Sequence, residues 1–167
     1  ILDSPHLTQI RGKRVMATVL FTDLRGFTGF CHEAEPEQVV AALDEYLTMI
    51  TRIVRRHGGT VHKFIGDGVM AVFGDPVPQP DHALRAVLAA RDMQQEMVRF
   101  RANLEEGEWE PHLRVGIDTG IVVAGDVGSG ELLEYTVIGD TVSAASRLEG
   151  LNKEHGTQIM ISKATRE

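Results

Sequence analysis

The chain has 167 residues, of which 43% are hydrophobic and 25% are charged. These values are typical of a single soluble globular domain with one sizeable core. Acidic residues outnumber Lys and Arg by 24 to 17, giving a net charge of -7, which argues against a nucleic-acid partner because phosphate binding needs a basic face. No apolar stretch approaches the roughly 18 residues that a membrane-spanning helix needs.

Two features bear on the cellular compartment. The segment 1–14 lacks the continuous apolar stretch of a signal peptide. The single cysteine, Cys31, cannot form an internal disulfide, which favours a reducing compartment. We therefore expect a cytoplasmic domain, within a parent protein that could itself be attached to a membrane.

The first third of the chain predicts a strand and a long helix. The aperiodic segment 1–13 is expected to be a linker, followed by one domain over 14–167. The β-branched and apolar run at 15–21 predicts the first strand. After a polar stretch, Pro36 stands at a helix start, and apolar residues at helical spacing predict a helix over 37–57.

The remaining elements complete an α+β pattern. Short apolar runs on both sides of Gly66-Asp67-Gly68 predict a tight hairpin. Further helices are expected over 81–101 and 140–154, and the further strands over 113–118, 121–127, 132–138 and 158–161. The first six elements follow the β-α-β-β-α-β order of ferredoxin-like domains, with additional β and α elements after them. We expect an antiparallel sheet with helices packed on one face.

Asp23 is the first candidate for chemistry, because it stands where an apolar strand ends and a glycine-containing turn begins. A carboxylate there points off the edge of the sheet, and the backbone N–H groups that follow can converge on an anion. The alternative is that Asp23 caps a short helix. The local sequence favours neither interpretation.

Asp67, at the tip of the predicted hairpin, is the second candidate. In a β-α-β-β order the first strand and the hairpin are neighbours, so Asp23 and Asp67 can face each other across adjacent strand ends. Two such carboxylates repel each other and shift each other's pKa unless a Mg²⁺ or Mn²⁺ pair binds between them. Taken alone, Asp67 is better explained as a turn residue, because Asp beside Gly is common in turns.

Four segments together resemble the catalytic domain of class III adenylyl and guanylyl cyclases. They are FTDLRGFT at 21–28, HKFIGDGVMAVFG at 62–74, LRVGIDTGIVVAGDVGS at 113–129 and EYTVIGDTVSAASRLE at 134–149. Each segment is a weak signal alone, but all four in this order and spacing are specific. The resemblance covers 14–161 and implies a bacterial-type adenylyl cyclase, which converts ATP to 3′,5′-cyclic AMP and pyrophosphate.

The resemblance also implies a head-to-tail homodimer, whose active sites are shared between the subunits, and two divalent metal ions, Mg²⁺ or Mn²⁺. Asp23 and Asp67 match the metal-binding aspartates, and the carbonyl of Leu24 matches a further ligand. The residues that match the triphosphate-binding turn are Arg25, Gly26, Phe27 and Thr28. Cyclase domains commonly follow a sensor or regulatory domain, so the resemblance also implies an upstream regulatory partner.

Other positions match residues that the second subunit contributes. Lys63 and Thr136 match the purine-selecting pair, and Arg147 matches the residue that stabilises the transition state. Adenine has an acceptor at N1 and a donor at N6, so Lys63 can donate to N1 while the Thr136 hydroxyl or the Val137 carbonyl accepts from N6. Lysine at 63 therefore favours ATP. Threonine at 136, where many relatives have aspartate, resembles the subset described as bicarbonate-responsive, which makes bicarbonate a candidate regulator.

Two departures from the family pattern leave alternatives open. Ser143 stands where the family usually has an asparagine that orients the ribose, and serine lacks the amide donor, although a water can partly replace it. The sequence also ends at Glu167, before the strand pair and triphosphate-binding lysine that family domains usually have. The alternatives are a low-activity or inactive nucleotide-binding module that dimerises and, disfavoured by Lys63, a guanylyl cyclase.

Overall fold

The computed structural model describes residues 12–104, 109–129 and 132–167. Of the segment 1–13, which was predicted to be a linker, residues 1–11 lie outside the described residues, and Lys13 already belongs to the first strand. None of the helices in the described parts of the chain combines the length and apolar character needed to cross a lipid bilayer.

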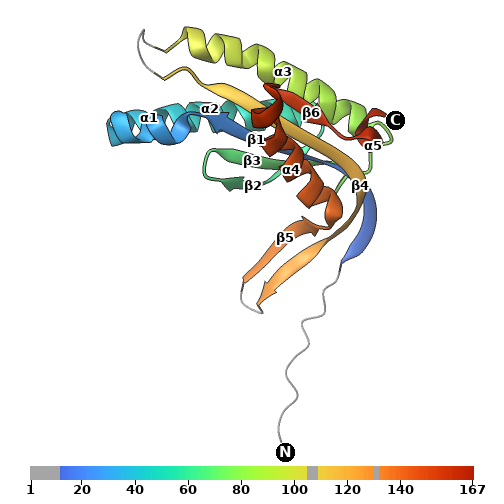
Figure 1. Ribbon diagram of the computed structural model, residues 1–167. Helices are drawn as coiled ribbons and strands as arrows, with labels where there is room; N and C mark the ends of the chain where they lie inside the picture. Colours follow the sequence, from blue (N-terminus) through green and yellow to red (C-terminus); the bar gives the residue numbers. More distant parts are fainter. Residues whose placement is uncertain (1–11, 105–108, 130–131) are drawn as a thin grey trace, which may run out of the picture.

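The described elements form a mixed α+β fold, as predicted (Figure 1). In chain order they are β1 (Lys13–Arg25), α1 (Phe27–Glu33), α2 (Pro36–Arg56), β2 (Thr60–Ile65), β3 (Gly68–Phe73), α3 (His82–Ala102), β4 (His112–Ser129), β5 (Leu132–Ile138), α4 (Asp140–His155), β6 (Ile159–Ile161) and α5 (Lys163–Arg166). The strands make a six-stranded sheet in the order β2-β3-β1-β4-β5, and β6 pairs with β4 in parallel. The other strand pairs are antiparallel. The strand β1 lies between β3 and β4 and pairs with both.

The helix α2 begins and ends where the sequence predicted it. Pro36 occupies the first turn, where its missing N–H costs no hydrogen bond. The Gln38 side chain accepts a hydrogen bond of 3.1 Å from the backbone N–H of Glu35, within a reciprocal capping box. Tyr46, Ile50 and other apolar residues on one side of the helix are buried against the sheet. Capping and burial therefore specify the same helix.

Helices cover both faces of the sheet, which differs from the expectation that they would pack on one face. Alternate residues of β1 point to opposite faces. Leu20 packs with α2 and α3 in the main core, whereas Ala17 and Val19 belong to a second cluster with Ala145 of α4. Figure 1 shows α2 and α3 lying together, with α4 apart from them across β1 and β4. The end of β1 thus lies between two layers of helices.

The strand β4 is continuous over 18 residues, so the prediction of two strands over 113–118 and 121–127 was wrong. Thr119 and Gly120 have the composition of a turn, but they pair with Thr18 and Ala17 of β1 without a break. A Cβ atom on Gly120 would lie 2.4 Å from Oγ1 of Thr141 in α4. The glycine therefore marks the close approach of a helix to a strand.

The short helix α5 was not predicted. The short helix α1 was only the alternative interpretation at Asp23, and Asp23 does not cap it, because the helix begins after Gly26. The strand β1 also extends to Arg25, so Asp23 lies inside the strand, near its end, and not after it. The side chain of Asp23 points to the face of the sheet that α4 covers, where it meets Arg114 and lies near Glu149.

Candidate active site

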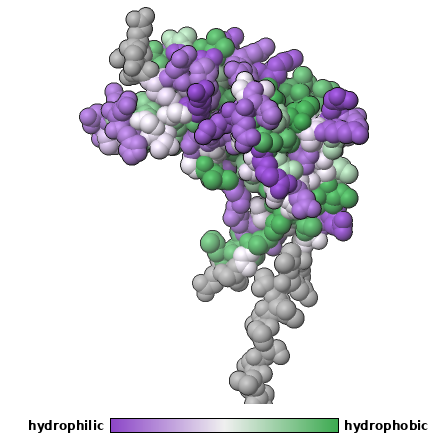
Figure 2. All heavy atoms as spheres, viewed as in Figure 1, coloured by the Kyte–Doolittle hydropathy of each residue, from purple (hydrophilic) through white to green (hydrophobic). Residues whose placement is uncertain are grey.

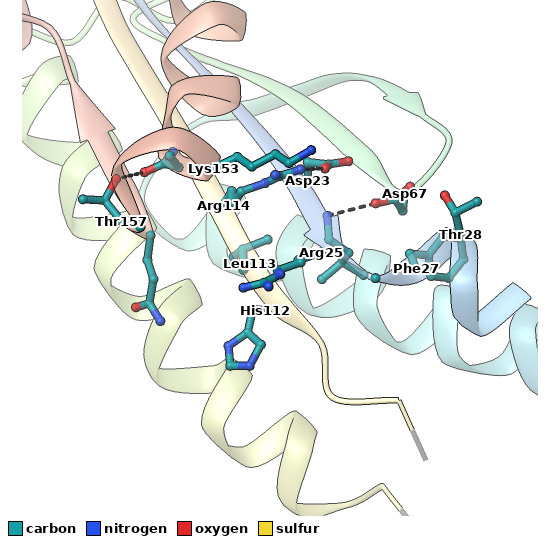
Figure 3. Close-up of a pocket in the computed structure, with 15 residues that line it drawn as sticks. Asp23, Arg25, Phe27, Thr28, Asp67, His112, Leu113, Arg114, Lys153 and Thr157 are labelled. Carbon is teal, nitrogen blue, oxygen red and sulfur yellow. Dashed lines mark hydrogen bonds and ion pairs between the residues drawn. The ribbon is translucent and has the colours of Figure 1, made fainter. Parts of the chain in front are cut away.

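A cleft of about 630 Å³ opens where the end of β1 meets the tip of the β2–β3 hairpin and the C-terminal end of α4 with the residues that follow it (Figure 3). Residues from four separate parts of the chain line it. Asp23 comes from β1, Asp67 from the hairpin, Arg114 from β4 and Lys153 from α4. The cleft is therefore a product of the tertiary fold and not of one local motif.

The structure brings the two predicted aspartates together at this cleft. A carboxylate oxygen of Asp67 accepts a hydrogen bond of 2.9 Å from the backbone N–H of Leu24, which ties the hairpin to β1 (Figure 3). Partial burial raises the pKa of Asp67, the Leu24 N–H opposes this effect, and the nearby negative charge of Asp23 raises the pKa further. The two carboxylates are thus close enough to interact directly.

Arg114 is a residue of the cleft that the sequence analysis missed. It lies opposite Asp23 in the β1–β4 register, and its guanidinium forms ion pairs with Asp23 and, at 3.0 Å, with Glu149 of α4. Burial and then the charge of Asp23 raise the pKa of Glu149, while Arg114 lowers it. The available signal was a charged residue within an otherwise apolar strand, Leu113 to Ile117. That pattern alone does not identify the partner of the arginine.

The residues present fit a divalent metal such as Mg²⁺ or Mn²⁺. Asp23 and Asp67 lie close enough for the charge of one to raise the pKa of the other, and Glu149 lies behind them beside Arg114. Carboxylate and carbonyl oxygens are the ligands that these ions prefer. The N–H of Leu24 points to Asp67, and in a strand the carbonyl of the same residue points to the same side, so it faces the acidic pair.

Side chains alone do not complete a metal site in the described residues. No group of three or more His, Cys, Asp or Glu side chains there is arranged to hold a metal ion. The further ligands would have to be carbonyl, water or substrate oxygens. This composition is typical of Mg²⁺, which keeps several waters and is commonly bound through one or two carboxylates together with substrate phosphates.

The turn 25–28 forms a wall of the cleft beside the acidic pair. Gly26 caps the start of α1 with a φ of 79°, a conformation that favours glycine. Phe27 is buried beneath the turn, whereas Arg25 and Thr28 are exposed. The first N–H groups of α1 have no acceptor within the helix, so they are available to an anion in the cleft.

The residues predicted to read the base and to stabilise the transition state lie elsewhere. They are Lys63, Thr136, Val137, Ser143 and Arg147, and none of these described residues lines the cleft. Lys63 forms an ion pair with Glu134 of β5, with 3.7 Å between Nζ and Oε1. Ser143 and Arg147 are exposed one turn apart on α4. One chain therefore assembles only the acidic and turn residues of the predicted site.

Comparisons with known proteins agree with this fold and cleft. Residues 12–167 match the family described as the adenylate and guanylate cyclase catalytic domain. Adenylate cyclase 1 of Rhizobium meliloti (strain 1021) is 40% identical over 164 residues, which cover 98% of this chain and 25% of that protein. The chain spans about a quarter of the length of the curated relatives that it matches.

Solved structures give the same result. The adenylyl cyclase CyaB from P. aeruginosa is 34% identical with a TM-score of 0.83, and the match covers 93% of this chain and 81% of that one. The guanylyl cyclase Cya2 is 36% identical with a TM-score of 0.84, and the match covers 92% of this chain and 78% of that one. Sequence, fold and relatives together show that the chain belongs to the adenylate and guanylate cyclase catalytic domain family.

Proposed function

We propose that this chain is the catalytic domain of an adenylyl cyclase, which converts ATP to 3′,5′-cyclic AMP and pyrophosphate. The observation that carries the proposal is the pairing of Asp23 and Asp67 at a cleft, in a chain of this family. Overall similarity does not separate ATP from GTP, because an adenylyl and a guanylyl cyclase are 34% and 36% identical to the chain. The choice of ATP rests on Lys63, which can donate to N1 of adenine but finds a donor at N1 of guanine.

In this proposal Asp23 and Asp67 hold two divalent metal ions, Mg²⁺ or Mn²⁺, together with the carbonyl of Leu24. When bound, the metal ions would lower the pKa of the ribose 3′-hydroxyl and offset negative charge on the triphosphate. With metal bound, Asp23 would be a metal ligand in place of its ion pair with Arg114. The released guanidinium, already inside the cleft, can then donate hydrogen bonds to phosphate oxygens.

The turn 25–28 would bind the triphosphate through its backbone N–H groups, beside the metal-binding pair. The 3′-oxygen attacks the α-phosphorus in line, the bond to pyrophosphate breaks, and the hydroxyl proton passes to solvent. No side-chain nucleophile is needed, so positioning and electrostatic stabilisation carry the rate.

We infer that the remaining site residues come from a second copy of the chain in a head-to-tail homodimer. Lys63 and Arg147 lie outside the cleft of their own chain. Figure 2 shows hydrophobic side chains gathered over the lower part of the molecule, where β4 and β5 lie. Leu132, Leu133 and Ile138 there are 78%, 59% and 51% exposed. An apolar surface of this kind is typical of an interface between proteins.

Within such a dimer the partner's copy of α4 would carry Arg147 to the reacting phosphoryl group. A guanidinium donates several fixed hydrogen bonds and stays charged, which suits the stabilisation of a charged transition state. Thr136 or the carbonyl of Val137 would accept a hydrogen bond from N6 of adenine, while Lys63 donates to N1.

A second candidate function is a nucleotide-binding module that dimerises but turns over slowly or not at all. The observation in its favour is Ser143, which is exposed on α4 one turn before Arg147 and is too short to replace an asparagine amide. It shares the metal and triphosphate residues with the first candidate. The two functions differ only in whether the product forms.

The proposal is tested by measuring cyclic nucleotide formation from ATP and from GTP with Mn²⁺. We expect cyclic AMP from ATP, no product from Asp23→Ala or Asp67→Ala, and normal rates from Asp44→Ala, an exposed aspartate on α2 outside the cleft. Mixing Asp23→Ala with Arg147→Ala should restore part of the activity, because one of the two composite sites in the heterodimer is intact.

Each alternative has its own outcome in this assay. A preference for GTP would establish a guanylyl cyclase. No product at high enzyme concentration, with nucleotide still bound, would establish the regulatory module. A verified heterodimer that fails to complement would contradict the shared site.

We also propose three features of the cellular setting. The domain would be cytoplasmic and joined to an upstream regulatory domain through the segment 1–13, in line with curated relatives that are about three to four times its length. Bicarbonate would act as a regulator, a suggestion that comes from Thr136. Comparing cyclic AMP formation with bicarbonate and with chloride at equal pH and ionic strength tests this last point.

A further inference from the structure

The only tryptophan of the chain, Trp109, contacts the start of the turn that lines the cleft and the helix α1 that follows it. Its indole Nε1 donates a hydrogen bond of 3.1 Å to the backbone carbonyl of Arg25. Its ring stacks on Phe30 of α1, with 4.7 Å between ring centroids and 17° between planes. The ring centroid of Phe27 is 5.5 Å away. One side chain thus holds the last residue of β1 and the first turns of α1.

The hydrogen bond fixes the orientation of the peptide group between Arg25 and Gly26. The C=O and N–H of a trans peptide point in opposite directions, so a carbonyl held toward Trp109 places the N–H of Gly26 on the far side. Gly26 lines both the cleft and the groove that contains Trp109, so it lies between them. The N–H of Gly26 is therefore directed toward the cleft.

The turn is also shaped to receive the indole. A Cβ atom on Gly26 would lie only 3.2 Å from Nε1 of Trp109, and the φ of 79° at this position disfavours other residues. An aliphatic or phenyl ring in place of the indole could fill the same space, but it could not hold the Arg25 carbonyl. The indole Nε1 of Trp109 thus contributes a hydrogen bond to the turn, which the packing of its ring does not provide.

We propose that Trp109 is a positioning residue, which orients the backbone N–H groups of the turn 25–28 for the triphosphate. The inference rests on the proposed function, because it needs nucleotide in the cleft. It has a second consequence. Trp109 is the single tryptophan of the chain and contacts the turn, so we expect its emission to change when a nucleotide binds to the turn.

The kinetic test uses the whole chain with Trp109→Phe, which keeps an aromatic ring against Phe30 but removes the N–H donor. The loss of one hydrogen bond predicts an increase in KM for ATP of about five-fold. The value of kcat should change less than KM, because the turn holds the triphosphate in both the ground state and the transition state. Phe30→Leu is the matched control, since it weakens the stacking and keeps the hydrogen bond.

A merely structural role for Trp109 predicts a different pattern. Both variants would then lower the melting temperature, and neither would change KM. If the positioning role is correct, Phe30→Leu lowers the melting temperature with KM close to that of the wild type, whereas Trp109→Phe raises KM. Equal KM values in all three proteins would overturn the inference.

The spectroscopic test uses the wild-type chain with Mg²⁺ and 3′-deoxy-ATP, which lacks the attacking hydroxyl. We expect a saturable change in tryptophan emission, with a midpoint equal to the Kd from calorimetry, and no change with Asp67→Ala. Unaltered emission in a protein that binds the nucleotide and makes cyclic AMP would overturn the role of Trp109 and leave the proposed function standing. Absence of nucleotide binding in the calorimeter would instead overturn the proposed function, and this inference with it.

Discussion

The contact between α4 and β4 at Gly116 provides a sharp test of how the fold positions Arg147. A Cβ atom on Gly116 would lie 2.1 Å from the backbone nitrogen of Glu149 and 2.3 Å from the carbonyl oxygen of Ala145. Non-bonded heavy atoms keep about 3.5 Å in ordinary contact, so Gly116→Ala requires α4 to withdraw by ~1 Å or more. The helix that moves is the one that carries Arg147.

The expected effects follow from this displacement. Overpacking a well-packed contact costs roughly 1–3 kcal/mol, and each kcal/mol lowers the melting temperature of a domain of this size by about 2–4 °C. We therefore expect Gly116→Ala to melt about 5 °C lower in circular dichroism. A misplacement of ~1 Å near the chemistry reduces turnover on the order of 100-fold. The loss should be in kcat, because Arg147 is assigned to the transition state.

Gly150 of the same helix is the matched control, since a Cβ atom there has no heavy atom within 4 Å. Gly150→Ala should raise the free energy of unfolding by about 0.5–1 kcal/mol, because alanine is the better helix former, and should keep the wild-type kcat. A Gly116→Ala protein with wild-type melting temperature and kcat would refute the argument. A similar loss of kcat in Gly150→Ala would show that the clash is not its cause.

Two further predictions concern stability. Asn152 is buried in α4; its amide donates to the carbonyl of Val115 at 2.9 Å and accepts from the hydroxyl of Thr157 at 2.7 Å. Asn152→Ala removes both hydrogen bonds and should cost roughly 2 kcal/mol in urea unfolding; a loss below ~0.5 kcal/mol would contradict this. Asp92 accepts a hydrogen bond from His57 at 2.8 Å and pairs with Arg91, and these contacts hold its pKa below the ordinary value of 3.8. A carboxyl group whose pKa is lowered by folding stabilises the protein fully when the pH is above the ordinary pKa. This stabilisation is lost as the pH falls through the lowered pKa. Asp92→Asn should therefore melt below the wild type at neutral pH, with a difference that shrinks in acid; a difference independent of pH would exclude the ion pairs as its source.

The sequence predicted an element best where the spacing of its apolar residues agrees with the Pro and Gly residues that mark its ends. Pro36 and Gly58 bound the long helix α2, and the prediction of 37–57 differs from Pro36–Arg56 by one residue at each end. Prediction failed at Gly120, which was left between two predicted strands and lies inside β4. A glycine within a strand indicates either a turn or a close neighbour, and here the neighbour is Thr141, on a helix that begins 20 residues later. Local pattern cannot distinguish these two cases.

The same limit applies to the cleft. Asp23 and Asp67 could be predicted because the β-α-β-β order makes their strands neighbours, and the register of β1 with β3 agrees with this. Arg114 could not, because its partners are set by the β1–β4 register and by the packing of α4. The hydrogen bond from Trp109 joins residues 84 positions apart and has no signature in the sequence around either one.

The unbroken β4 also limits how a cyclase of this design can open and close. At about 3.3 Å per residue, its 18 residues have a contour of ~60 Å. Arg114 lies near one end, and Gly125 near the other is paired with Thr136. The residues proposed to contact the phosphates and those proposed to contact the base are thus joined within a subunit by one continuous strand. In the proposed homodimer, substrate would then enter and pyrophosphate would leave by movement of one subunit against the other, and a regulatory domain attached to either subunit would change turnover by changing that movement.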